Sequence, residues 1–230
     1  MLEKYEEKQK MKKIMKKSAS GVSIIGGVDG PTSIFIAGKS KKFNLKHEIK
    51  KYLYKQRRAQ VEKSIVANPH TLLEVVKFMR EKYGAIQVSE RSYSYIEERD
   101  CLKESLIIQH KPELLGELAQ IAKPVNRDED LLREFWNKLE ERSQRAREIA
   151  DDELPMDFHV YEISVPDVGK MRVAVDTKWD VFGCSYSGSK KGMEKLKNIA
   201  KELYTYYGVT QRDIQERTQR YSALVTELAS

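Results

Sequence analysis

Apolar residues recur at three- and four-residue steps between residues 44 and 150, and at every second position after residue 154. The first spacing is typical of amphipathic helices and the second of β-strands. The pattern predicts an α+β fold in four parts. These are a basic extension over 1–17, a glycine-rich strand-turn element over 18–43, an all-helical segment of about five helices over 44–150, and a small β-β-β-α-α domain over 151–230.

The helical segment is divided by capping residues and prolines. The first helix spans 44–66, and its expected inward residues are Leu45, Ile49, Tyr52, Leu53, Val61 and Ile65. Asn68 and Pro69 predict the start of the second helix, because asparagine caps helices and proline suits the first helical position. Gly84 is expected to end it.

Three more helices complete this segment. One is expected from Ser92 to Gln109, with inward residues Tyr95, Ile96, Leu102, Leu106 and Ile107. A short one begins at Pro112 and ends before Pro124. The last is expected from about Arg127 to Ala150 with Asn126 as its cap. Its strongly charged half beyond Trp136 is expected to project into solvent or to pack on a partner.

The carboxyl-terminal part changes period. Alternation predicts strands at Phe158–Val165, Met171–Asp176 and Val181–Tyr186, the first two forming a hairpin. A helix over Lys190–Tyr207 should end at Gly208. Thr210 and Asp213 have the spacing of a capping box, which predicts the start of a final helix.

Two apolar runs, Val22–Ile25 and Ile34–Ala37, flank a segment that reads Gly26-Gly27-Val28-Asp29-Gly30-Pro31-Thr32. Glycine permits positive φ values, proline fixes φ, and aspartate accepts bonds from backbone N–H groups just ahead of it. The segment predicts a strand and a tight turn, followed by a second strand, which would make a glycine-turn hairpin over 21–38, or by a helix.

This stretch resembles the signature of the β subunit of the sodium-ion-translocating decarboxylases. The family signature is very similar to residues 26–34, usually with alanine in place of Val28. In that family the aspartate is taken to bind the translocated sodium on a re-entrant membrane loop. The resemblance therefore implies a sodium contact at Asp29 and Thr32. The rest of the sequence predicts no other metal and no cofactor. The implied signature loop consists of Gly26, Gly27, Asp29, Gly30, Pro31 and Thr32.

The resemblance covers only residues 20–40, and the family's second ion-binding motif is missing. A membrane-spanning helix needs about 20 mostly apolar residues. The Val22–Ala37 stretch is shorter and is broken by glycines, a proline and an aspartate. We therefore expect a soluble chain that carries the signature and is not itself a membrane pump.

The net charge of +7 is unevenly distributed. Residues 39–63 hold ten Lys and Arg against two Glu, which is a net +8, and residues 1–17 hold seven Lys against three Glu, a net +4. Six cations of the helix over 44–66 define a candidate basic surface: Lys46, Lys50, Lys51, Lys55, Arg57 and Arg58. Such a helix can bind nucleic acid or an anionic membrane, although a solvated face over a packed one is the simpler interpretation.

The 230 residues are 40% hydrophobic and 9% aromatic, which is enough for a folded core. The two cysteines, Cys101 and Cys184, provide no disulfide framework and fit a reducing compartment. The basic start of the chain lacks the apolar stretch of a signal peptide. These features predict a cytoplasmic protein, with attachment to the membrane periphery as an alternative.

Other candidate chemistry has little support from spacing. Cys184 precedes a predicted helix and could be a nucleophile paired with His159 or His110, but a buried strand cysteine is the simpler interpretation. The segment from Ser187 to Gly192 could hold an anion at a helix start, or simply cap that helix. The four histidines show no metal-ligand spacing.

The sequence therefore predicts a binding or accessory protein with a protein partner and no identified catalytic residue. One alternative is a soluble component of a sodium-translocating decarboxylase system, which would associate with the membrane subunits and contribute to sodium binding. Another is a nucleic-acid-associated protein that uses the helix over 44–66. An enzyme built on Cys184 ranks last.

Overall fold

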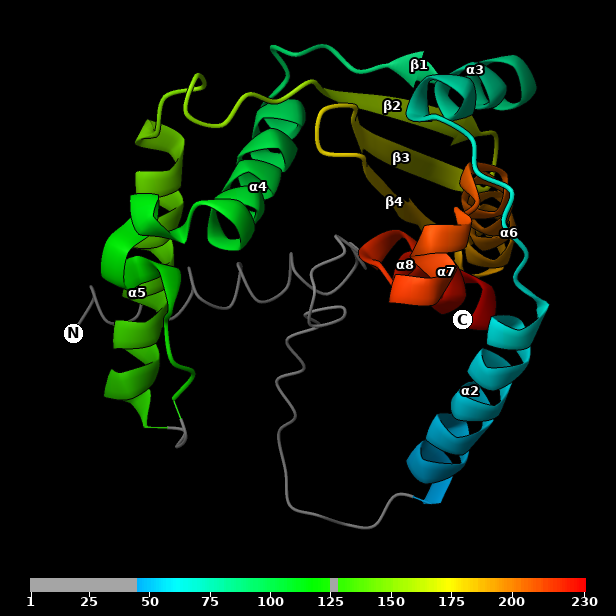
Figure 1. Cartoon of the computed structure of the whole chain (residues 1–230), viewed down its shortest axis with the longest axis horizontal. Coiled ribbons are helices and arrows are strands. Elements are labelled where there is room, and N and C mark those ends of the chain that lie inside the picture. The colour runs from blue at the N-terminus through cyan, green and yellow to red at the C-terminus, as the bar shows by residue number, and fades with distance from the viewer. Residues whose placement is uncertain (1–44, 125–127) are drawn as a thin grey trace. The chain divides into compact units, whose positions relative to one another are not determined.

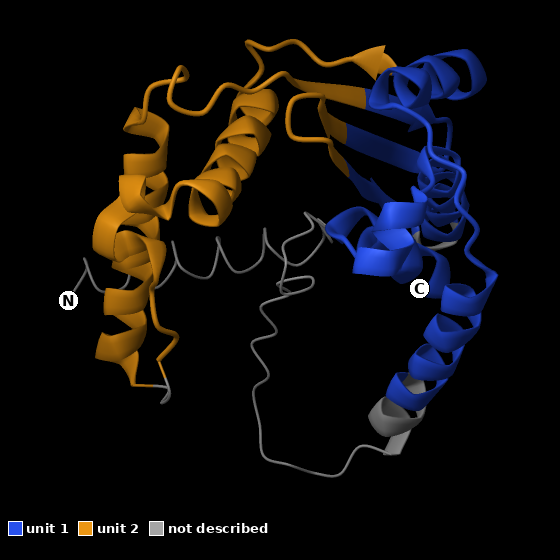
Figure 2. Cartoon of the chain, in the orientation of Figure 1, with its two compact units in different colours: residues 1–85, 162–173, 183–230 blue, residues 86–161, 174–182 orange. Residues whose placement is uncertain are grey.

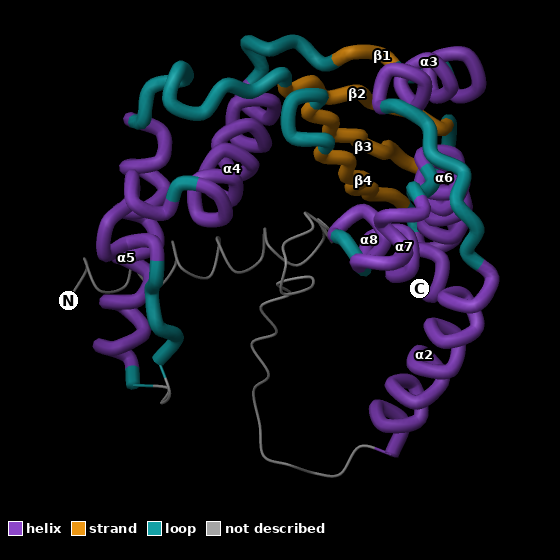
Figure 3. Tube along the Cα trace, in the orientation of Figure 1, coloured by secondary structure: helices purple, strands orange, loops and turns teal. Residues whose placement is uncertain are grey.

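The computed structural model describes residues 45–124 and 128–230, with side chains placed for 51–124, 128–189 and 192–230. It contains helices and a four-stranded antiparallel sheet, which confirms the α+β class (Figures 1 and 3). The predicted basic extension, the glycine-turn hairpin and the cap at Asn126 lie outside the described residues.

The elements follow the chain in an order that matches most of the predicted pattern. They are α2 (Leu45–Ser64), α3 (Leu72–Tyr83), β1 (Ile86–Gln87), α4 (Tyr93–His110), the 3₁₀ segment η1 (Pro112–Ala119), α5 (Glu129–Glu148), β2 (Phe158–Val165), β3 (Gly169–Asp176), β4 (Val181–Gly188), α6 (Lys190–Tyr207), α7 (Gln211–Glu216) and α8 (Gln219–Ala229). The strands are ordered β1-β2-β3-β4 in the sheet. The short strand β1 corrects the expectation that residues 44–150 are entirely helical.

The described chain forms two compact units, called unit 1 and unit 2 (Figure 2). Unit 1 comprises residues 45–85 together with 162–173 and 183–230, and unit 2 comprises 86–161 and 174–182. Strands β2, β3 and β4 each contribute residues to both units.

In unit 1, α8 packs on α2, α6 and α7, and α6 also packs on α3. The fully buried residues of unit 1 come from the sheet, from these helices and from the connection between α6 and α7, and include Met79, Ile163, Met171, Leu196, Leu203 and Val209. The predicted bounds of α6 are confirmed, and Gly208 ends this helix by donating its N–H to the Tyr204 carbonyl over 2.9 Å.

The start of α3 differs from the prediction. Thr71, and not Asn68, is the N-cap, because Thr71 and Glu74 form a reciprocal capping box. Pro69 instead lies in the connection from α2 to α3. Gly84 ends α3 in the left-handed region, as predicted (φ 65°).

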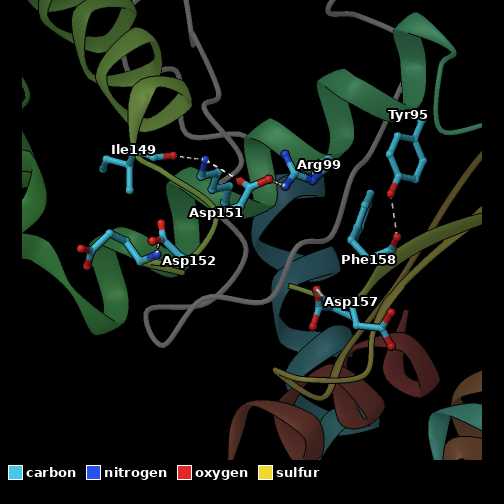
Figure 4. Close-up of polar contacts among 10 residues, drawn as sticks. Tyr95, Arg99, Ile149, Asp151, Asp152, Asp157 and Phe158 are labelled. Carbon is cyan, nitrogen blue, oxygen red and sulfur yellow. Dashed lines mark hydrogen bonds and ion pairs between the residues drawn. The ribbon is translucent and has the colours of Figure 1, made fainter. Parts of the chain in front are cut away.

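Unit 2 has its own buried cluster, formed by residues of α4, η1, the end of α5, the connection that follows it, and β2. Its members are Tyr95, Leu102, Leu106, Ile107, Leu115, Ala146, Leu154, Phe158 and Val160. Tyr95 fixes α4 to β2, because its hydroxyl donates to the Phe158 carbonyl over 2.7 Å (Figure 4). Ile96 was predicted to face inward, but it is exposed.

Charged side chains of α4 hold the connection that follows α5. The Arg99 guanidinium bonds a carboxylate oxygen of Asp151 at 2.7 Å (Figure 4), and the buried Lys103 ammonium contacts the other oxygen at 3.0 Å and the Ile149 carbonyl. These two partners, first Arg99 and then Lys103, lower the pKa of Asp151. These contacts therefore hold the connection after α5 against α4.

The charged half of α5 packs on α4 along one side, while most of its charged side chains are exposed, as expected. Arg142 bonds Glu104 of α4 at 2.6 Å, Arg147 bonds Asp100 at 3.0 Å, and Ala146 is buried. The N-cap of this helix is Asp128, whose side chain accepts from the N–H groups of Asp130 and Leu131. The helix therefore packs through its charged end, because the complementary charges lie on α4.

The predicted final helix is two helices. The capping box of Thr210 and Asp213 opens α7 as expected. Arg217 then takes a positive φ of 51°, and Thr218 caps α8. The Thr218 hydroxyl also donates to Asp213 at 2.6 Å, so this carboxylate fixes both the start of α7 and the break after it.

Candidate functional site

Helix α2 uses only a narrow stripe of its surface for packing. From residue 51 onward the half-buried positions on α2 are Tyr54, Arg58, Val61 and Glu62, which share one side of the helix, and α2 packs on α8. Tyr52 and Leu53, predicted to face inward, are 61% and 46% exposed. The predicted apolar stripe is therefore wrong at these two positions.

The cations of α2 divide between the packed stripe and the exposed surface. Lys51, Lys55 and Arg57 are exposed, whereas Arg58 is half-buried and bonds Glu62 at 3.0 Å. This bond raises the pKa of Arg58 above its already high ordinary value. Lys46 and Lys50 lie on the first turns of α2, ahead of its described side chains.

The two units carry opposite formal charge. Over residues 45–85, 162–173 and 183–230, unit 1 has 20 Lys and Arg against 11 Asp and Glu, a net +9. Unit 2 has 12 against 20, a net −8. The sequence alone placed the positive surplus in the first quarter of the chain. In the structure, the described part of that surplus, α2, shares a unit with the carboxyl-terminal helices.

A small network fixes the connection from α2 to α3 within unit 1. The N–H groups of Asn68 and His70 donate to the carbonyls of Val209 and Tyr207, each over 3.0 Å. Arg220 then donates to the carbonyls of His70 and Gly208 at 2.8 and 2.9 Å. The α2–α3 connection is therefore held by residues from the far end of the chain.

Aromatic rings join α3 to α6 in the same unit. Tyr206 stacks between His70 and Phe78, with ring centroids 4.1 Å apart in both pairs. Lys82 lies 5.2 Å from the Phe78 centroid, and both Lys82 and Tyr83 bond Glu202. No local sequence pattern indicates this stack, because the pairing residues lie far apart along the chain.

The candidate nucleophile Cys184 is buried, as the simpler interpretation expected. Cys184 lies on β4 with 6% of its surface exposed, and burial raises the pKa of its thiol. A protonated buried thiol is a poor nucleophile. The candidate partners His159 and His110 belong to unit 2, where His159 bonds Asp157 at 3.0 Å and His110 packs against Trp179. The geometry thus favours a packing role for Cys184.

The other candidate sites have local structural roles. Ser189 caps α6 by accepting from the Gly192 N–H over 3.1 Å, and its own N–H donates to the Val168 carbonyl. In the part of the chain that the structure describes, no group of three or more His, Cys, Asp or Glu side chains could hold a metal ion. The signature loop residues Gly26, Gly27, Asp29, Gly30, Pro31 and Thr32 lie outside that part.

None of the helices over 45–124 and 128–230 has the length and apolar character needed to span a membrane. Comparison of the chain with protein-family models, with curated proteins and with solved structures gives no match. The function of the chain is therefore inferred from its geometry and charge, and the exposed basic surface of α2 is the candidate site.

Proposed function

We propose that this chain is a nucleic-acid-binding protein that contacts the phosphate backbone through α2 of unit 1. The observation that carries the proposal is the exposure of α2. Its packed stripe occupies one side, and Lys51, Lys55 and Arg57 stand on the remaining surface. The net charge of +9 on unit 1 would add a long-range attraction for a polyanion.

The shape and chemistry of α2 support phosphate contact. Lysine and arginine on an exposed helix can neutralise phosphates and release condensed counterions, which provides most sequence-independent affinity. Tyr52, exposed among these cations, offers a ring for stacking on an unpaired base. Duplex and single-stranded probes therefore distinguish whether α2 contacts phosphates alone or also stacks on bases.

The test measures binding of fluorescent duplex DNA and single-stranded RNA over a series of salt concentrations. The variant Lys51→Glu/Lys55→Glu/Arg57→Glu should weaken binding at least about tenfold at low salt and reduce the slope of log K against log salt by about 2 to 3. Its matched control, Arg91→Glu/Lys123→Glu/Lys178→Glu, makes the same charge change at exposed positions of unit 2 and should retain the wild-type affinity.

Two results would contradict this function. One is an equal loss of affinity in both triple variants, because net charge alone would then explain binding. The other is that the wild-type protein binds neither nucleic acid at low salt but binds vesicles rich in anionic lipid. That result would indicate that α2 binds a membrane surface.

The glycine-rich signature favours a second candidate, an accessory role in a sodium-translocating decarboxylase system with Asp29 as an ion ligand. Saturating sodium at 100 times its dissociation constant would stabilise the chain by about 2.7 kcal/mol. We expect a higher melting temperature in sodium than in potassium at equal ionic strength, and no such difference for Asp29→Asn. Identical wild-type melts in the two salts would reject a sodium site in the isolated chain.

A further inference from the structure

The first half of α5 carries an apolar face that does not join the buried cluster of unit 2. The face consists of Leu131, Leu132, Phe135, Trp136 and Leu139, whose spacing places them on one side of the helix. None of the five is buried, and Leu131 and Trp136 are each 47% exposed. We call this surface the α5 apolar face.

The second half of the same helix is anchored to α4 along one side. Ala146 belongs to the buried cluster of unit 2, and Arg142 and Arg147 are bonded to acidic residues of α4. The exposed face therefore does not reflect a helix that is loosely attached to its unit. An apolar patch at the exposed end of an anchored helix is typical of an interaction surface, and tryptophan is enriched among the residues that contribute most to binding.

Acidic side chains outnumber basic ones around the α5 apolar face, where the two cations Arg133 and Lys138 are already paired with Asp130 and Glu134. Glu129 and Glu140 lie seven residues before and four residues after Trp136, on the same side of the helix, and both are exposed. The segment η1, which packs on α5, bears an open hollow of about 470 Å³ that is lined in part by Glu113 and Glu117. With a net −8 on unit 2, the complementary occupant is a basic helix with exposed apolar side chains.

The chain itself contains such a helix. On α2, Tyr52 and Leu53 are exposed beside Lys51, Lys55 and Arg57. We propose that the α5 apolar face binds α2 of a second copy of this chain. The net charges of +9 on unit 1 and −8 on unit 2 attract these two surfaces to each other, and each surface repels its own kind.

This pairing joins two different surfaces, so it is head-to-tail. Each added copy leaves one free α2 and one free α5 apolar face, and association should therefore continue beyond a dimer unless the arrangement closes into a ring. Salt should weaken it, because the charges lie at exposed positions. The inference does not depend on nucleic-acid binding, although a polyanion on α2 would compete with the second copy.

The test is sedimentation velocity of the full chain, treated with nuclease, over a range of concentrations at about 0.05 M and about 0.5 M salt. We expect the average mass to rise with concentration at low salt and to fall towards the monomer at high salt. Leu131→Ala/Trp136→Ala should raise the dissociation constant at least about tenfold. The control Leu73→Ala, at a position that is 72% exposed on α3, should associate as the wild type does.

A charge exchange identifies the occupant. Glu140→Lys and Arg57→Glu should each weaken association. The two variants mixed together should associate better than either alone, because the substituted α5 of one copy and the substituted α2 of the other again carry opposite charges.

A monomer at low salt overturns the proposal, and so does a dimer that is insensitive to salt and does not grow further with concentration. Association that is lost with Trp136→Ala but unchanged with Arg57→Glu overturns α2 as the occupant. Nucleic-acid affinity, measured separately, can fail without affecting any of these results.

Discussion

Replacing Gly208 by alanine is expected to destabilise the fold by more than about 3 kcal/mol, because the backbone and the surrounding space both require glycine. Gly208 has φ 59° and ψ −162°, a region that is nearly exclusive to glycine and costs other residues about 1–3 kcal/mol. A Cβ atom built there would lie 2.0 Å from the Asn68 carbonyl oxygen. The backbone oxygen cannot turn away as a flexible side chain could.

The expected damage extends to the connection between α2 and α3. Moving Asn68 away would break the backbone hydrogen bonds from Asn68 to Val209 and from His70 to Tyr207. It would also displace the carbonyls of His70 and Gly208, to which Arg220 donates. Buried or half-buried groups that lose their partners cost about 1–3 kcal/mol each. The helix that carries the candidate site would then lose its attachment at one end.

Urea unfolding of the variant checks this expectation, with Gly84→Ala as the matched control. Gly84 also has a positive φ, of 65°, but a Cβ there meets no atom within 4 Å. Alanine at this position should cost only about 1 kcal/mol, which is the penalty of the left-handed conformation alone. Equal losses for the two variants would show that the contact with Asn68 has no energetic weight.

Local sequence patterns predicted the elements whose signals lie within a few residues. The strands β2 and β3 follow from alternation, and α6 follows from its apolar spacing and from Gly208. The two-residue strand β1 has no period to detect, because two positions cannot alternate. The sequence contained a stronger signal than Asn68 for α3, since Thr71 and Glu74 have capping-box spacing and form that box in the structure.

Features set by distant partners could not be predicted in this way. The pattern placed cations on α2, but it could not predict that Arg58 packs while Tyr52 is exposed. Which side of α2 is packed depends on its contact with α8, a distant segment of the chain. The pattern also could not show that Arg142 and Arg147 of α5 bond α4, because their partners Glu104 and Asp100 lie far away in the sequence. The charge division between the units also depends on which distant segments fold together.

Glu227 is expected to make the fold less stable as the pH rises above the ordinary titration range of a glutamate. It lies on α8 with only 4% of its surface exposed, and its Oε1 atom finds no hydrogen-bond partner among the described residues. Burial raises the pKa of this carboxyl, and the neighbouring Lys201 and Lys197 only partly oppose the effect. The charge of Glu227 helps to raise the pKa of Cys184 and Tyr186 on β4 and of Tyr204 on α6.

The sign of the pH effect follows from the proton count. Between the pKa of Glu227 in the unfolded chain and its raised pKa in the fold, the native state keeps a proton that the unfolded state has lost. The free energy of unfolding contributed by this group therefore falls as the pH rises, by at most about 1.4 kcal/mol per pH unit. Above the native pKa the contribution stays constant at its least favourable value.

The variant Glu227→Gln removes this titration with little change in size. Other carboxylates, such as Asp151 and Glu202, have lowered pKa values and impose the opposite trend at acid pH, so the informative quantity is the difference between variant and wild type. We expect this difference in the free energy of unfolding to grow in favour of glutamine as the pH rises from about 4 to 7. Glu194→Gln, which removes an exposed charge from α6, should show no such growth. A constant difference across that range would mean that Glu227 ionises in the fold as readily as in the unfolded chain, with its charge stabilised inside unit 1.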